Sequence, residues 1–275
     1  ERFRVDRAEL ERFYDVKGSA LRERRMREFL ETWRTRLATI DFDKLGVEGR
    51  IDATLLRTRL THELRLLARD QERTREMAVV LPFAEEIATL EEKRRLLEPM
   101  DARAAGSTLE RIRVSVEKTG EGLEAGLKKP ADKAAKEVVD VASKKEKVAP
   151  ITVSKVVGAR AVRRLDELQG TLQEWFATFD GYDPMFSWWT REPHKQLAER
   201  LADYRKFLRE KIVGIDPEAK EEPIIGDPVG RAGLVEELEN ELVAYTPEEL
   251  IAIAEKEFAW VEIELKRAAR EMGLG

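Results

Sequence analysis

The stretch LDELQGTLQEWFATF, residues 165–179, carries the strongest pattern in the chain. Its large apolar residues recur every three or four positions, at Leu165, Leu168, Leu172, Trp175, Phe176 and Phe179. This spacing places all six on one face of a helix of about four turns. We therefore expect a central helix here, with its apolar face in the core.

The same helical spacing extends outward in both directions from this stretch. Earlier stripes run through residues 29–37 and 56–67, and a later one runs through residues 197–212 and is closed by Gly214. Since no segment alternates with the period of a strand, the sequence predicts an all-α, multihelical fold with roughly two-thirds of its residues in helices.

Two capping boxes predict where helices begin. In each, a Ser or Thr hydroxyl accepts from the amide three residues later, and a Glu carboxylate reaches back to the first amide. The pairs are Ser107 with Glu110 and Thr246 with Glu249, the second with Pro247 between them. We expect helices to start at both places.

The distribution of aromatic residues predicts the domain organisation. No Phe, Tyr or Trp occurs between residues 84 and 173, so we expect residues 84–164 to form a peripheral helical arm, with a solvated helix at 128–147. Residues 165–275 would form the helical core, with a proline- and glycine-rich loop at 214–230. Because the chain opens on Glu1 and not on Met, we expect that a segment upstream of it has been removed.

Composition excludes several classes of function. The chain has 275 residues, of which 38% are charged and 42% hydrophobic, and its formal net charge is −5. This charge gives no basic footprint for nucleic acid, and no apolar run is long enough to span a bilayer. Cysteine is absent, which removes disulfides, thiol nucleophiles and cysteine-ligated metals.

The two histidines offer little for metal or acid–base chemistry. His62-Glu63 begins like a zinc-peptidase helix, but the position where the second histidine should stand is Leu66. His194 follows Pro193, and the simpler interpretation is an ordinary histidine in the first turn of a helix. We therefore expect no catalytic or metal-binding residue in this chain.

The adjacent Trp188 and Trp189 are candidates for a binding surface. Two consecutive residues cannot share one helix face, so at least one indole should point toward a cavity or a partner. A core plug and a groove wall both remain open for this pair.

Four segments in order resemble the bacterial DUF885 family: residues 51–57 (IDATLLR), Trp188-Trp189 followed by residues 191–193 (REP), residues 223–228 (PIIGDP) and residues 245–250 (YTPEEL). The resemblance covers the chain from about Leu10 to its end. It implies an all-helical, channel-type zinc metallopeptidase-like fold of the gluzincin kind, about twice this length, whose zinc motif lies in the C-terminal half. None of the zinc ligands can be carried over onto this chain.

The resemblance implies that this chain is the non-catalytic N-terminal half of a hydrolase and forms a wall of its substrate channel. Candidate channel residues are Trp188, Trp189, Arg191, His194 and Tyr245. The expected partners are the C-terminal half of the same polypeptide, which would hold the zinc, and a peptide substrate. Self-association through exposed apolar surface is also expected. The family is bacterial, and the sequence leaves an exported and a cytoplasmic location equally open.

A second hypothesis explains the same residues without an enzyme. The high charge density and the lack of any catalytic constellation also suit a self-contained helical protein-interaction module. Whether a zinc-binding half follows residue 275 would distinguish the two.

Overall fold

The computed structural model describes residues 1–128, 148–219 and 223–273. The described residues are 77% helical and contain no strand, so the all-α prediction is confirmed. None of the described helices is both long enough and apolar enough to cross a membrane.

The chain divides into two compact units, and two helices contribute residues to both. Unit 1 comprises residues 1–29 and 67–226, and unit 2 comprises residues 30–66 and 227–275. The divisions fall inside α2 (Ala20–Ala38) and α3 (Val47–Met77).

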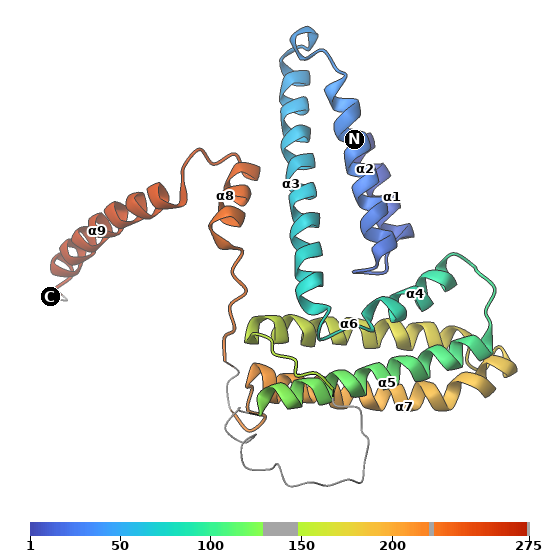
Figure 1. The fold of residues 1–275 in the computed structure, drawn as a ribbon. Helices are drawn as coiled ribbons and strands as arrows, with labels where there is room; N and C mark the ends of the chain where they lie inside the picture. Colours follow the sequence, from blue (N-terminus) through green and yellow to red (C-terminus); the bar gives the residue numbers. More distant parts are fainter. Residues whose placement is uncertain (129–147, 220–222, 274–275) are drawn as a thin grey trace. The chain divides into compact units, whose positions relative to one another are not determined.

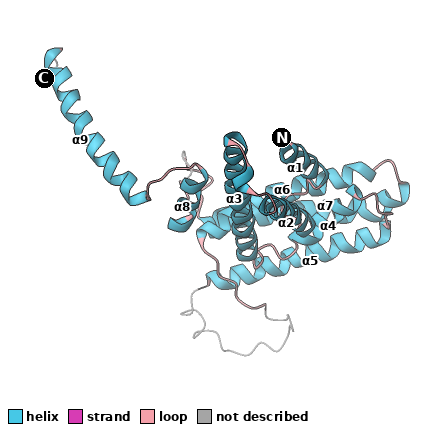
Figure 2. Cartoon of the chain, turned by 90° about the horizontal axis from the view of Figure 1, so that it is seen from above, coloured by secondary structure: helices cyan, strands magenta, loops and turns pink. Residues whose placement is uncertain are grey.

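Unit 1 is built around a bundle of four helices: α4 (Ala84–Arg95), α5 (Ala102–Leu127), α6 (Lys155–Phe179) and α7 (Pro184–Phe207). The helices α5, α6 and α7 lie side by side, with α6 antiparallel to the other two (Figures 1 and 2). α7 continues into a wider π-type turn, η3 (Leu208–Val213), and Gly214 ends it with a left-handed φ of 83°. α1 (Arg2–Phe13), the first part of α2 and the last part of α3 also belong to this unit.

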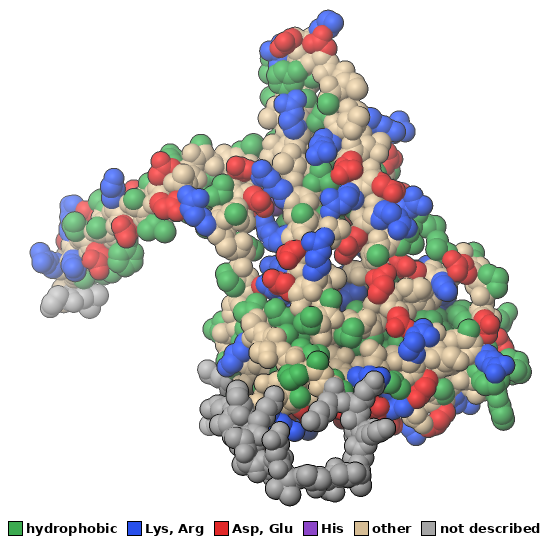
Figure 3. Space-filling view, in the orientation of Figure 1, with side chains coloured by type: hydrophobic (Ala, Val, Ile, Leu, Met, Phe, Trp, Pro, Cys, Tyr) green, Lys and Arg blue, Asp and Glu red, His purple; other side chains and the backbone are tan. Residues whose placement is uncertain are grey.

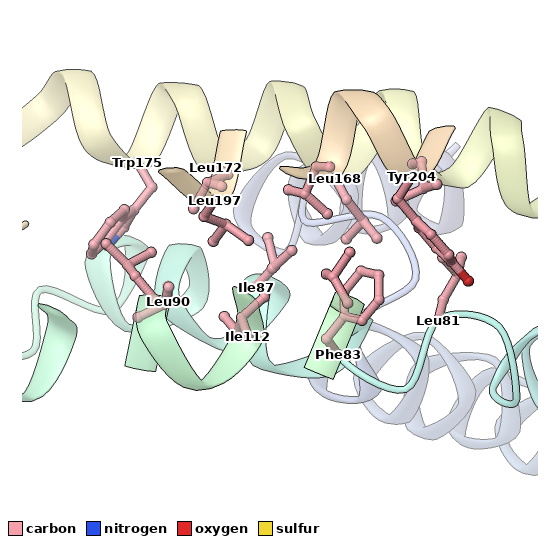
Figure 4. Packing of buried hydrophobic residues seen from close by; sticks show 14 of the residues in the cluster. Leu81, Phe83, Ile87, Leu90, Ile112, Leu168, Leu172, Trp175, Leu197 and Tyr204 are labelled. Carbon is pink, nitrogen blue, oxygen red and sulfur yellow. The ribbon is translucent and has the colours of Figure 1, made fainter. Parts of the chain in front are cut away.

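The core of unit 1 lies between these four helices. Figure 4 shows side chains from all four pointing toward one another, with Trp175 near one end and Tyr204 near the other. The Tyr204 hydroxyl donates to the backbone oxygen of Val80 over 2.7 Å, so its one polar atom is satisfied inside the core. The predicted stripe on α6 faces this core: Phe179 is partly buried, and its other five members are buried.

The expected peripheral arm at 84–164 is corrected by the structure. Its α4 and α5 carry some of the most buried residues of the core, namely Ile87, Leu109, Ile112, Val116 and Leu123. Although this segment lacks aromatic residues, it belongs to the core, where aliphatic side chains of α5 lie in one cluster with the aromatic ones of α6 and α7. Of the predicted helix at 128–147, residues 129–147 lie outside the described residues.

The two predicted capping boxes have opposite outcomes. Thr246 and Glu249 form the expected reciprocal pair at the start of α9 (Pro247–Glu271). The start at Ser107 is wrong, because α5 begins five residues earlier, where the Asp101 side chain accepts from the Ala104 amide. Ser107 lies inside the helix and donates to the backbone oxygen of Arg103.

Unit 2 contains the rest of α2, the short 3-10 turn η1 (Phe42–Lys44), most of α3, α8 (Gly230–Asn240) and α9. Leu30 and Leu60 are fully buried, whereas nearly every residue of α9 is exposed. Residues 165–275 therefore do not form one core, since α8 and α9 belong to unit 2. Of the expected loop at 214–230, the described residues up to Val229 lie outside helices, and Gly230 is the first residue of α8.

Candidate functional site

The turn between α6 and α7 fixes the position of the candidate aromatic residues in unit 1. Gly181 adopts a φ of 83°, which residues other than glycine rarely adopt. Asp183 then caps α7, because its Oδ1 accepts from the backbone amides of Met185 at 2.9 Å and Phe186 at 3.2 Å. Pro184 occupies the first helical position, where a missing N–H has no consequence. The aromatic segment is therefore helical from its start.

The helix sorts the aromatic residues into a buried and an exposed set. Phe186 is fully buried, with its ring centroid 5.2 Å from that of Trp175 and 5.1 Å from that of Phe179. On the opposite side, Trp188 is 78% exposed, and Met185 and Tyr182 are exposed as well. We call Tyr182, Met185, Trp188 and Trp189 the aromatic patch.

Trp189 packs against α5 through both its backbone oxygen and its ring. In a regular helix the amide of residue 193 would donate to the Trp189 oxygen, but Pro193 has no N–H. That oxygen instead faces Gly106 of α5, where an added Cβ would lie only 2.5 Å from it. Arg103 places its guanidinium 5.6 Å from the centre of a Trp189 ring. The inner edge of the patch is therefore tightly fixed, while Trp188 stays open.

His194 is a packing residue in this structure. Its ring stacks on Phe176 with centroids 3.8 Å apart and planes 8° from parallel. Burial lowers the pKa of His194 below its ordinary value, and the negative charge of Asp180 only partly opposes this shift. The expectation of a first-turn histidine is corrected, because α7 begins at Pro184 and His194 lies in its middle.

Arg191 belongs to a polar network at the edge of the aromatic patch. Its guanidinium donates to Asp180 Oδ1 over 2.8 Å, and Ser187 Oγ donates to the same oxygen over 2.6 Å. The hydrogen bond from Ser187, followed by that from Arg191, lowers the pKa of Asp180. Ser187 Oγ also accepts from the Gly181 amide over 3.0 Å. This network joins the turn to the first helical turns of α7 and engages the Ser187 hydroxyl, so it acts as a positioning device.

Tyr245, the fifth predicted residue, lies in unit 2 on the connection between α8 and α9. Its side chain is 53% exposed and it directly precedes the Thr246 cap. The structure thus groups Trp188, Trp189, Arg191 and His194 on α7 and leaves Tyr245 in a separate part of the chain.

Unit 2 contains a second polar cluster, between α3 and α8. His62 is buried with its Nε2 3.6 Å from Glu237 Oε2, and Arg65 donates to Glu239 over 2.6 Å. His62, Arg65 and Glu239 line an open pocket together with Thr58 and Thr61. Sequence reasoning missed this cluster, because about 170 residues separate its two sides and no local pattern joins them.

The zinc that the resemblance implies does not fit the described residues of this chain. Within those residues, no three His, Cys, Asp or Glu side chains lie close enough together to hold a metal ion. His62 faces a single carboxylate, and the ring of His194 is stacked on Phe176.

Fold and exposure together define a multihelical all-α protein with exposed aromatic side chains around the start of α7. The chain belongs to the DUF885 family, described as bacterial proteins of unknown function, whose model matches residues 10–274. The four segments that carry the resemblance lie on α3, on α7, in the loop before α8 and at the start of α9. No match was found among curated proteins or among solved structures.

Proposed function

We propose that this chain is a non-catalytic, substrate-positioning part of a metallopeptidase-like hydrolase, and that the aromatic patch contacts the substrate. The observation that carries the proposal is Trp188, a large indole that is 78% exposed at the start of a rigidly anchored helix. Contiguous exposed apolar patches typically mark a binding surface, and tryptophan is enriched at such surfaces.

The anchoring of α7 supports a binding role because it lowers the entropic cost of contact. Asp183 caps the helix, and the Asp180 network links its first turns to the preceding loop. The Trp189 backbone packs closely against Gly106 of α5. Tryptophan itself has only two side-chain torsions, so a ligand that covers it loses little additional freedom. The patch suits apolar or aromatic side chains of an extended peptide.

Peptide binding to the whole chain tests this proposal. The probe is a fluorescein-labelled peptide of about ten residues that alternates leucine, phenylalanine and glycine. We expect Trp188→Ala to weaken its binding about tenfold, because a central aromatic contact contributes about 1.4 kcal/mol or more. Trp260→Ala, which removes an exposed indole from α9, serves as the matched control and should leave binding unchanged.

Mass spectrometry of the same peptide tests the non-catalytic part of the proposal. The peptide should remain intact after incubation with the chain and added zinc. Cleavage that His62→Ala abolishes would contradict it, and so would equal binding by the Trp188 and Trp260 variants.

The alternative is a self-contained interaction module. The exposed apolar face of α9 favours it, because Pro247 is the only residue of this helix that is buried. Under this alternative the peptide probe would show no preference for the aromatic patch.

A further inference from the structure

The helix α9 exposes an apolar face along its whole length. Its 25 residues span about 37 Å at 1.5 Å per residue. Phe258 and Leu265 are 67% and 68% exposed, and Pro247 is the only residue of the helix that is buried. Figure 3 shows apolar side chains on the surface of α9 among acidic and basic ones.

The spacing of this face is that of a coiled coil. Seven residues follow one another at alternating steps of three and four, namely Ile251, Ala254, Phe258, Val261, Leu265, Ala268 and Met272. We call these residues the seam. A repeat of 3.5 residues keeps a stripe facing a neighbouring helix over several turns, which is the geometry of knobs-into-holes packing. The face is therefore shaped for another helix.

The positions that flank the seam are acidic on both sides. They carry six glutamates, one leucine and one alanine, and no lysine or arginine; the glutamates are Glu248, Glu255, Glu257, Glu262, Glu264 and Glu271. The four basic residues of the helix, Lys256, Lys266, Arg267 and Arg270, all lie away from these positions.

The central glutamates of these flanks have no partner of their own. Glu264 and Glu271 pair with Arg267 on the outer face, and Glu248 pairs with Arg231. Glu255, Glu257 and Glu262 make no ion pair with any described residue. Three uncompensated negative charges therefore surround Phe258 and Val261, the middle of the seam.

This charge pattern selects among the possible occupants of the seam. A second copy of α9 would place glutamate against glutamate in either the parallel or the antiparallel arrangement, and like charges at these positions oppose pairing. An anionic membrane would repel the same flanks, because interfacial helices carry lysine and arginine beside their apolar face. The complementary occupant has basic residues there.

The contact between α8 and α3 shows the same chemistry inside unit 2. There Arg65 of α3 forms an ion pair with Glu239 of α8 at 2.6 Å and lies 4.0 Å from Glu236. An acidic helix face of this part of the chain thus already packs on a basic one.

We propose that α9 is a docking helix for a partner protein helix whose apolar stripe is flanked by lysine and arginine. The apolar seam supplies the contact area, and the glutamates at its edges set orientation and partner choice.

Two synthetic helical peptides test this proposal on the whole chain. Both carry leucine at the seam positions of four heptads; one has lysine at all flanking positions and the other has glutamate. We expect the lysine peptide to bind at least about tenfold more tightly than the glutamate peptide at low salt. The preference should shrink as salt is raised, because exposed charges are screened.

Charge reversal in the chain provides the second arm. The triple variant Glu255→Lys, Glu257→Lys and Glu262→Lys should reverse the preference. A control with the same change of net charge, Glu121→Lys, Glu124→Lys and Glu199→Lys, should retain it; these three glutamates are exposed on α5 and α7. Circular dichroism of both triples checks that each remains folded.

Three results would overturn the proposal. The first is equal binding of the two peptides, or binding of neither. The second is an unchanged preference in the seam triple. The third is self-association of the unmodified chain that Phe258→Ala abolishes, which would assign the seam to a second copy.

Discussion

Replacing Phe258 by glutamate should leave the chain folded, although the same replacement at a buried phenylalanine should unfold it. Phe258 is 67% exposed, so only about a third of its side chain is in contact with the protein. Full burial of a large apolar side chain contributes about 1.5–3 kcal/mol, so loss of this contact costs about 0.5–1 kcal/mol. The new carboxylate lies three residues from Glu255 and four from Glu262, and two like-charge pairs add about 0.4–1 kcal/mol. The total destabilisation is at most about 2 kcal/mol.

Phe186→Glu supplies the matched comparison. Phe186 is fully buried against Trp175, Phe176 and Phe179. Emptying such a site costs about 3–5 kcal/mol even for alanine, and burial of an unpaired carboxylate costs more. Because single domains are stable by only about 5–15 kcal/mol, unit 1 should be largely unfolded in this variant.

Urea denaturation followed by circular dichroism at 222 nm measures both variants. The spectrum of Phe258→Glu should overlay that of the unmodified chain, with a midpoint shift equivalent to at most about 2 kcal/mol. The spectrum of Phe186→Glu should lose much of its helical signal without urea. A loss of more than about 3 kcal/mol in the Phe258 variant would show that α9 packs against apolar surface, and the docking inference would fail with it.

Two further substitutions test the packing around α7. Gly106→Ala should destabilise the chain by about 1–3 kcal/mol, because the new Cβ would lie 2.5 Å from the Trp189 oxygen. Gly170→Ala should instead stabilise α6 by about 0.5–1 kcal/mol, because a Cβ at Gly170 would meet no atom within 4 Å. Thermal melts compare the two, and equal effects would contradict the close approach of α5 and α7. His194 has a folded-state pKa below the ordinary value of about 6.5, so the unfolded chain binds a proton more readily. Stability should therefore fall as pH drops below about 6.5 and stay level above it, and a His194→Gln variant that retains this fall in denaturant midpoints would refute the assignment.

The fold class followed from sequence because helical spacing is a local property. The stripe on residues 165–179 and the cap at Thr246 depend on residues within one or two turns, and both are found as predicted. The start of α7 was predicted wrongly because it depends on a contact with a segment distant in sequence. A proline at position 193 reads as a helix beginning, and only the approach of Gly106 shows how the freed Trp189 oxygen is accommodated inside a continuous helix.

The candidate site was predictable in part. Sequence alone identifies the adjacent tryptophans and requires that at least one of them be exposed; the structure exposes both, Trp188 at 78% and Trp189 at 39%. The roles of Asp180 and Arg103 depend on the geometry of the turn and on a second helix, so no local pattern announces them. The peripheral-arm prediction failed because the aromatic partners of α5 come from α6 and α7, which are distant in sequence.

Hydrogen exchange of the whole chain, with and without the leucine–phenylalanine–glycine peptide, tests the proposed substrate-positioning role most directly. New protection is expected at the amides of residues 181–192, around the exposed Trp188, while the peptide remains uncleaved. Protection confined to α9, no protection at all, or cleavage of the peptide by the chain would contradict it.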